Sequence, residues 1–154
     1  MASREFKVKA GFLYNFTQFV EWPATAFENP ESPFIFGILG TDPFGTYLDS
    51  ILAGEKVAGH SITVQRFQAA KEIQHCQILF ISLPHPDSTD LAEMKKHSVL
   101  TVSDAEGFMK LGGMIRFMQN NKIRLQINPA AIKTAQLNIS SKLLRVAEIY
   151  TDSK

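Results

Sequence analysis

Apolar segments of strand length that alternate with helical segments are the feature that most constrains this fold. The four segments are Phe34–Gly40, 61–66, Ile78–Ser82 and 99–102. Helices are expected between them at about residues 44–53 and 87–96. Because parallel strands need crossover connections, which are usually helical, this alternation predicts a mainly parallel sheet covered on both faces. The expected fold class is therefore α/β, a three-layer α/β/α sandwich.

The last third of the chain departs from this alternation. Residues 113–118 and 123–127 flank Asn120-Asn121, which suits a two-residue type I′ hairpin turn. The hairpin is expected to add one antiparallel edge strand to the sheet. Asn128 should cap a helix that begins at Pro129. Ser140 should begin a last helix, which runs through Leu143, Leu144, Ala147 and Ile149.

The first segment, from about Arg4 to Trp22, has helical periodicity. Its apolar residues cover an arc of about 240°, wider than the stripe of an ordinary surface helix. They are Phe6, Val8, Ala10, Phe12, Leu13, Tyr14, Phe16, Phe19 and Val20. Pro23 is expected to end the helix, since the residue before a proline is disfavoured in the α region. Such a helix must be covered on more than one side, and we expect both terminal helices to pack on the sheet.

Composition and length indicate one globular domain over residues 1–154. The net charge is +1, with 16 basic and 15 acidic residues and 45% hydrophobic residues. Basic residues are not gathered as nucleic-acid binding requires, so no nucleic-acid partner is expected. No apolar run reaches about 18 residues, so no membrane insertion is expected. Residues 1–3 are interpreted as a short added leader that replaces a signal peptide, or alternatively as the true start of a cytoplasmic protein. Residues 28–33 form the strongest loop signal.

Sequence motifs for catalysis are weak. The segment from Gly40 to Thr46 has the glycine spacing of a phosphate loop, but it lacks the lysine that would reach a phosphate. We interpret it as a strand-to-helix turn in which Asp42 caps the helix. The strand at Ile78–Ser82 is followed by no carboxylate, so a phosphoacceptor site is excluded. Ser103-Asp104 lacks a G-x-S-x-G turn, and Asp104 is expected to cap the short turn at 105–110.

The histidines and the single cysteine do not suggest a metal site. The histidines are scattered, with no spacing that places two on one helix face: His60, His75, His85 and His97. Cys76 lies in an apolar run, where a thiol usually acts as inert packing. One cysteine excludes an intrachain disulfide but does not define the compartment. We therefore expect no catalytic residue, no metal and no cofactor.

Several short blocks resemble the YfiR-like family. The first combines residues 9–16 with Phe19-Val20-Glu21-Trp22-Pro23. Later blocks follow in the same order over nearly the whole chain: Asp42-Pro43-Phe44-Gly45, residues 75–82, Thr101-Val102-Ser103-Asp104, Gly107-Phe108, Gly112-Gly113-Met114-Ile115, Ile127-Asn128 and residues 140–144. Each block is weak alone, but together they are specific.

The resemblance implies a non-enzymatic periplasmic protein, without a membrane span. In this family a regulator represses a membrane-anchored diguanylate cyclase by binding its periplasmic part. An outer-membrane lipoprotein sequesters that regulator, which releases cyclic-di-GMP synthesis and biofilm formation. Some relatives carry disulfides, whereas this chain has only Cys76.

Two kinds of site remain open from the sequence. Partner binding is predicted at the first helix and its exit, because aromatic residues dominate binding hot spots: Phe12, Phe16, Phe19, Trp22 and Phe44. These aromatics are alternatively core residues, or the helix forms a homodimer seam. A small-molecule sensor would instead use a crevice at the carboxyl ends of the parallel strands, lined by Asp42, Ser103 and Asp104.

Overall fold

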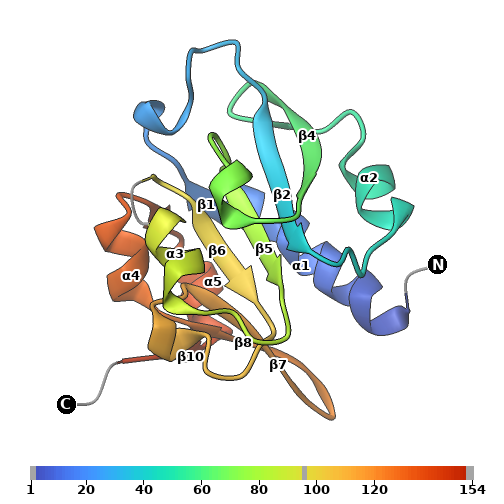
Figure 1. Cartoon of the computed structure of the whole chain (residues 1–154), viewed down its shortest axis with the longest axis vertical. Coiled ribbons are helices and arrows are strands. Elements are labelled where there is room, and N and C mark those ends of the chain that lie inside the picture. The colour runs from blue at the N-terminus through green and yellow to red at the C-terminus, as the bar shows by residue number, and fades with distance from the viewer. Residues whose placement is uncertain (1–2, 95–96, 152–154) are drawn as a thin grey trace.

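The main element of the structure is a curled, mainly parallel sheet of eight strands. The computed structural model describes residues 3–94 and 97–151. The sheet order is β10-β8-β7-β6-β5-β2-β4-β3, and Figure 1 shows β2, β5 and β6 at its centre. The strands are β2 (Phe34–Gly40), β3 (Lys56–Val57), β4 (His60–Phe67), β5 (Ile78–Ser82), β6 (Leu100–Ser103), β7 (Ile115–Asn120), β8 (Lys122–Ile127) and β10 (Glu148–Ile149). The predicted α/β class with a mainly parallel sheet is confirmed.

Alternate residues of the central strands point into two separate cores. Ile78 and Phe80 of β5 belong to a large cluster that includes Leu13 and Phe16 of the first helix. Leu79 and Ile81 point to the opposite face, toward a smaller cluster with Leu91 and Phe108. A strand that is buried on both faces needs apolar residues at every position, which is why β5 is an unbroken apolar run.

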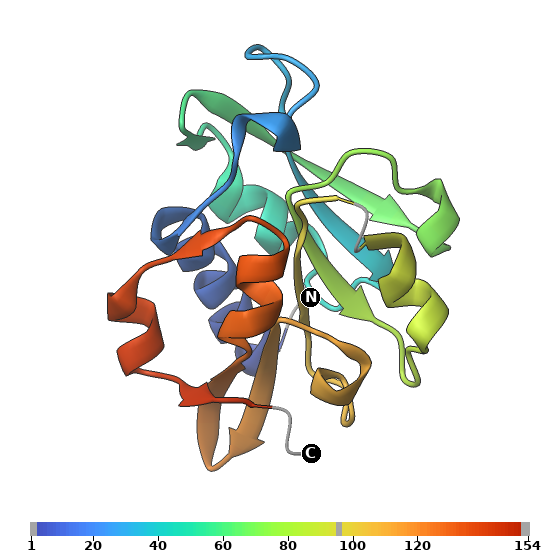
Figure 2. The ribbon, with the colours of Figure 1, turned by 90° about the vertical axis from the view of Figure 1, so that its left-hand side faces the viewer.

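The helices surround this sheet. They are α1 (Arg4–Phe19), α2 (Thr46–Leu52), α3 (Ser88–Met94), α4 (Pro129–Thr134) and α5 (Ser141–Arg145), with short 3₁₀ turns η1 (Ala24–Ala26), η2 (Ala70–Glu72) and η3 (Met109–Leu111). Figure 2 shows α4 and α5 on the same side of the molecule as α1. Because the sheet is curled, the predicted three-layer α/β/α sandwich with both terminal helices packed on the sheet is not confirmed. Lys95 and Lys96 of the predicted helix at 87–96 lie outside the described residues.

The first helix ends earlier than Pro23 alone predicts. α1 stops at Phe19, and Val20–Glu21 forms β1, which pairs antiparallel with β9 (Asn138–Ile139). The amide of Ser140 also donates to the carbonyl of Phe19, at 2.7 Å. Pairing with a distant segment therefore ends the helix, and the prediction of a helix through Trp22 is wrong.

The hairpin exists, but its turn and its place in the sheet differ from the prediction. Asn120 pairs with Lys122, so the turn centres on Asn121 alone, at φ 71°. The predicted two-residue turn is therefore wrong. The hairpin strand β8 is antiparallel to β7 but does not form the edge, because β10 pairs with it in parallel. β3 adds a further antiparallel pair at the opposite edge.

The C-terminal segment follows its predicted caps but not its predicted length. The Asn128 side chain accepts from the amide of Ala131, with Pro129 at the first helical position. Ser140 likewise accepts from the amide of Lys142 at the start of α5. The last helix ends at Arg145, however, and residues 148–149 form β10. The prediction that the helix includes Ile149 is wrong, since pairing with β8 extends this backbone.

Candidate partner-binding surface

A shallow, partly apolar groove lies between α1 and α2. It has a volume of about 590 Å³ and is lined by Val8, Gly11, Phe12, Tyr14, Asn15, Tyr47, Ile51 and Glu55. These residues define the α1–α2 groove. Val8 is 44% exposed, which is high for a large apolar side chain.

Helix geometry explains why α1 contributes one side of this groove. Val8, Gly11, Phe12 and Asn15 lie three or four residues apart, so they share one face. The buried positions, which include Ala10, Leu13 and Phe16, lie on the face toward the sheet. α1 therefore uses one face for the core and presents a second, partly apolar face to the surface.

Gly11 is the residue of this groove that the fold does not require. A Cβ atom at Gly11 would meet no atom within 4 Å, and its φ is not positive. Glycine inside a helix costs about 0.5–1 kcal/mol relative to alanine. Neither packing nor backbone conformation explains it, whereas close approach of another molecule to the helix would.

Polar contacts hold one end of the groove in place. The Tyr14 hydroxyl donates to Glu55 Oε1 at 2.7 Å, which joins α1 to the segment after α2. This hydrogen bond, with burial and the negative charge of Glu55, raises the pKa of Tyr14. Lys7 Nζ lies 5.4 Å from the ring centroid of Tyr47. The groove is thus a preformed surface with a polar rim.

Phe12 also borders a second cleft on the other side of α1. This cleft, of about 430 Å³, lies against the β7–β8 hairpin and the segment after α5. It includes Ile123, Leu125 and Val146, and Val146 is 70% exposed. Phe12 is half-buried between the two clefts, so it is accessible from both.

The structure divides the five predicted aromatic residues into two groups. Phe16 and Phe44 are fully buried, Phe16 stacked on Phe117 and Phe44 edge-on to Phe80. In this conformation their side chains are part of the core and not of the surface. Phe12 and Phe19 are half-buried against the same core.

Trp22, the fifth of these aromatics, is half-buried and held by specific contacts. Its ring meets Phe34 edge-on with centroids 4.8 Å apart, and its Nε1 donates to the carbonyl of Gln77 at 2.8 Å. A buried indole usually needs a partner for its N–H, and Trp22 has one within its own chain.

The three residues of the predicted crevice are engaged within the fold. Ser103 is fully buried and donates to the carbonyl of Ile81 at 2.7 Å. Asp104 accepts from Lys9 Nζ at 2.9 Å. The amide of Ala105 donates to Ser103 Oγ, so the hydroxyl of Ser103 makes the contact predicted for Asp104.

Asp42 lies apart from that pair, beside Arg66. Its Oδ1 accepts from the amide of Phe44, whereas the N-cap of α2 is Gly45 without a side-chain cap. The strand-to-helix turn is confirmed, but Asp42 does not cap the helix. Arg66 Nε donates to Asp42 Oδ2 at 2.9 Å and its Nη2 donates to Asp49 Oδ2 at 2.7 Å. The hydrogen bond from Arg66 lowers the pKa of Asp49.

Cys76 is buried as its apolar surroundings predicted. It is 4% exposed, and burial raises the pKa of its thiol to about 12. Its Sγ donates to the carbonyl of Ile78 at 2.9 Å. A thiol with so high a pKa is neutral at physiological pH and is therefore a poor nucleophile.

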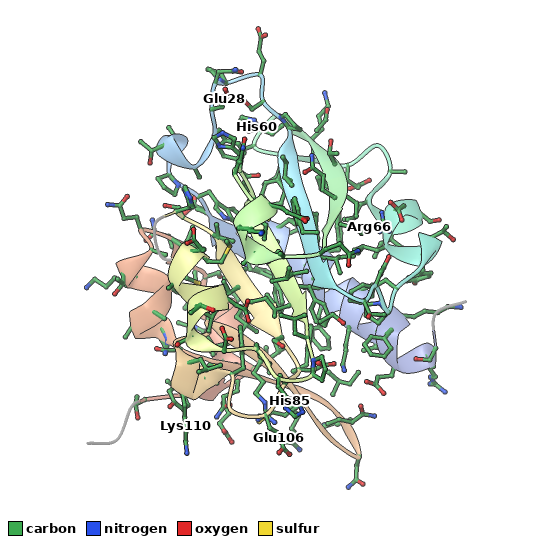
Figure 3. The ribbon with its side chains drawn as sticks, viewed as in Figure 1. Glu28, His60, Arg66, His85, Glu106 and Lys110 are labelled. Carbon is green, nitrogen blue, oxygen red and sulfur yellow. The ribbon has the colours of Figure 1, made fainter. Side chains whose placement is uncertain are left out.

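The four histidines do not share one site: His75 and His97 line one cleft beside Cys76, whereas His60 and His85 lie elsewhere. The ring of His60 stacks on Phe27 at 3.7 Å between centroids, and its Nδ1 lies 2.6 Å from the carbonyl of Ser32. Figure 3 shows His60 and His85 at opposite ends of the molecule. Within residues 3–94 and 97–151, no group of three His, Cys, Asp or Glu is placed to hold a metal ion.

Comparison with known sequences identifies the family. The sequence profile of the YfiR/HmsC-like family matches residues 6–148. The chain belongs to the YfiR/HmsC-like family. This family is regulatory and periplasmic, and it acts with cyclase-type partners. No curated protein matches the chain in a sequence search.

The family match covers the α1–α2 groove. It begins two residues into α1 and ends in β10, so both sides of the α1–α2 groove fall within the matched segment. None of the helices in the described parts of the chain is long and apolar enough to cross a membrane.

Sequence reasoning identified Phe12 but missed the other groove residues. Val8, Tyr47 and Ile51 carry no distinctive local signal, because only the packing of α2 against α1 brings them together. Gly11 did carry a signal, since an isolated glycine inside an apolar helical pattern needs a reason.

Proposed function

We propose that this chain is a non-enzymatic periplasmic regulator that binds the periplasmic part of a membrane-anchored diguanylate cyclase or a similar receptor. By repressing or modulating that receptor it controls cyclic-di-GMP signalling and, through it, biofilm formation. Family membership supports the class of partner. An outer-membrane lipoprotein is a second expected partner, which would compete with the receptor.

The observation that carries the proposal is the α1–α2 groove, with Gly11 among its lining residues. The groove combines the exposed side chain of Val8 with half-buried apolar neighbours, a glycine among its lining residues and a polar rim. Interface cores are apolar and aromatic, with polar groups around them. We propose that an apolar segment of the receptor lies in this groove, over Gly11 and beside Phe12.

The test is a substitution that fills the groove without touching the core. Gly11→Leu should abolish binding to the purified periplasmic segment of the cyclase, because the leucine side chain would fill the part of the groove in which the partner is proposed to lie. Gln18→Leu, on an exposed position of the same helix outside the groove, is the matched control. Binding is measured by titration calorimetry, and cellular cyclic-di-GMP is measured in a strain that expresses each variant. Normal binding by a folded Gly11→Leu variant would exclude this site.

A small-molecule sensor is the second candidate function, but at a different place from the predicted crevice. A cleft of about 550 Å³ lies between α4 and the end of the chain, where Met114, Pro129, Ala131 and Ile149 supply an apolar lining. Small-molecule sites usually have this size and character. Native mass spectrometry of the purified protein should reveal a bound ligand that Ala131→Trp removes; an unliganded mass for the wild type argues against the sensor.

A further inference from the structure

The cleft beside the β7–β8 hairpin exists because β10 covers just the last part of β8. β10 pairs in parallel with β8 at Gln126 and Ile127, and no described strand lies beside residues 122–125 on that side. Figure 2 shows the tip of the hairpin projecting beyond β10. Residues 122–125 and 145–148 therefore line the two sides of a cleft of about 430 Å³. Small-molecule sites typically have volumes of about 300–1,000 Å³.

One hydrogen bond shows which backbone groups of β8 face this cleft. The amide of Tyr150 donates to the carbonyl of Ile127 at 2.7 Å, so the backbone of Ile127 points outward, toward β10. Successive residues of a strand direct their N–H and C=O groups to opposite sides, and the continuous register with β7 excludes a bulge. The amides of Ile123 and Leu125 therefore also point outward, to the cleft.

Three cationic side chains line the same cleft. Lys122, Arg124 and Arg145 are exposed, and none of them forms a hydrogen bond or an ion pair with another described residue. The one carboxylate in the described lining is that of Glu148, whose Oε2 already accepts from Gln126 Nε2 at 2.9 Å. The cleft thus carries an excess of positive charge, which attracts an anion.

Much of the remaining lining is apolar. Val146 is 70% exposed, and it lines the cleft with the half-buried side chains of Phe12, Met118 and Ile123. Removing such side chains from water is favourable, at about 25 cal/mol per Å² of apolar surface. An occupant that pairs with the cations and also covers these side chains must be both anionic and apolar.

The short length of the open edge distinguishes such a ligand from a strand of another protein. The edge offers the cleft the amides of Ile123 and Leu125, because the hairpin turns at Asn121 and pairing with β10 begins at Gln126. A strand that adds to a sheet edge uses alternating donors and acceptors over several residues. Two amides beside three cations suit one compact anionic headgroup, which accepts hydrogen bonds and donates none.

We propose that this cleft binds a single-chain fatty acid, with its carboxylate held by the three cations and its aliphatic chain against Ile123 and Val146. Arginine suits this role, because its planar fork of N–H donors matches the two oxygens of a carboxylate. The proposal does not rest on receptor binding. The cleft is separate from the α1–α2 groove except at Phe12, which borders both.

Two probes of equal chain length test the charge requirement. Decanoate, below its micelle-forming concentration, should bind the wild-type protein at least about tenfold more tightly than decanol in titration calorimetry, because decanol lacks the charge that pairs with the cations. Equal affinity for the two probes would overturn the proposal. It would instead indicate the cleft beside α4, whose described lining contains no charged residue.

A pair of matched variants tests the position of the headgroup. Arg124→Gln should weaken decanoate binding at least about tenfold, because it removes a charge and a paired donor from the cleft. Lys133→Gln, which changes an exposed cation of α4 outside the cleft, should bind decanoate as the wild type does. Both changes lie at exposed positions, so both variants should keep the wild-type melting temperature. Wild-type affinity in a folded Arg124→Gln variant would overturn the proposal.

Amide NMR locates the ligand independently of these substitutions. In the ¹⁵N-labelled wild type, decanoate should shift the amide resonances of Ile123 and Leu125, which face the cleft, more than those of Val8 and Tyr47 in the α1–α2 groove. The experiment contains no receptor, so its outcome is independent of the proposed regulatory function. If the largest shifts lie outside residues 122–125 and 145–148, this cleft is not the binding site.

Discussion

Replacement of Trp22 by alanine separates a structural role from a partner-binding role for this residue. The change removes an edge-on ring contact with Phe34 and a hydrogen bond to the carbonyl of Gln77. The ring pair contributes about 0.5–1.5 kcal/mol and the hydrogen bond about 0.5–1.5 kcal/mol. Burial adds to these, and a fully buried aromatic residue costs about 3–5 kcal/mol when truncated to alanine. Because Trp22 is half-buried, we expect Trp22→Ala to lower the free energy of unfolding by about 2–4 kcal/mol.

A conservative variant divides this loss into its parts. Trp22→Phe keeps a ring against Phe34 and loses only the N–H donor. The carbonyl of Gln77 still accepts from the amide of Leu100 at 2.9 Å, so no buried acceptor is left without a partner. The expected loss is therefore about 1 kcal/mol. Urea unfolding followed by circular dichroism measures both variants. If Trp22→Ala changed the unfolding free energy by less than about 0.5 kcal/mol, the indole would behave as a surface residue and the reasoning would be wrong.

Three further predictions follow from buried groups. Cys76 should not react with a thiol reagent at pH 8 until the protein unfolds. Because burial raises the pKa of its thiol from 9.0 to about 12, the unfolding free energy should decline as the pH rises from 9 toward 12, and Cys76→Ala should make that decline smaller. Lys9→Met should lower the unfolding free energy by about 1–3 kcal/mol, which is less than the loss of a fully buried ion pair, because Glu5 and Asp104 are partly hydrated. A higher unfolding free energy in urea titrations would contradict this. Gly113→Ala should lower the unfolding free energy by about 1–3 kcal/mol, because its Cβ would lie 2.3 Å from the buried ring of Phe108, whereas Gly11→Ala should raise it by up to about 1 kcal/mol. Equal melting temperatures for the two variants would contradict this difference.

The central strands could be predicted from the sequence because each is a continuous apolar run with polar ends. β2 and β5 have the predicted bounds, Phe34–Gly40 and Ile78–Ser82. The two-residue strands could not be predicted, since nothing local distinguishes Val20–Glu21 or Glu148–Ile149 from the ends of the helices that precede them. Their extended conformation comes from pairing with segments far away in the sequence.

The candidate site was only partly predictable for a related reason. The wide apolar arc of α1 correctly indicated that the helix is covered on more than one side. Much of that cover is the chain's own, because Phe12 contacts Phe117 and Phe6 contacts Phe44. Residue type alone cannot tell a buried aromatic such as Phe16 from an exposed one. The exposed face became visible only once α2 was placed beside α1.

The two ends of α1 are fixed to different parts of the fold, and this bears on how the groove would bind. Near its start, Lys9 is 3% exposed and bridges to Asp104 after β6. At its end, the carbonyl of Phe19 accepts from Ser140 and the chain continues into β1. A helix held at both ends is already ordered before a partner arrives, so little conformational entropy is lost on binding. Changes at Gly11 should then act through contact with the partner alone. Loosening the anchor at Lys9 should weaken binding from a distance, by allowing the start of α1 to move.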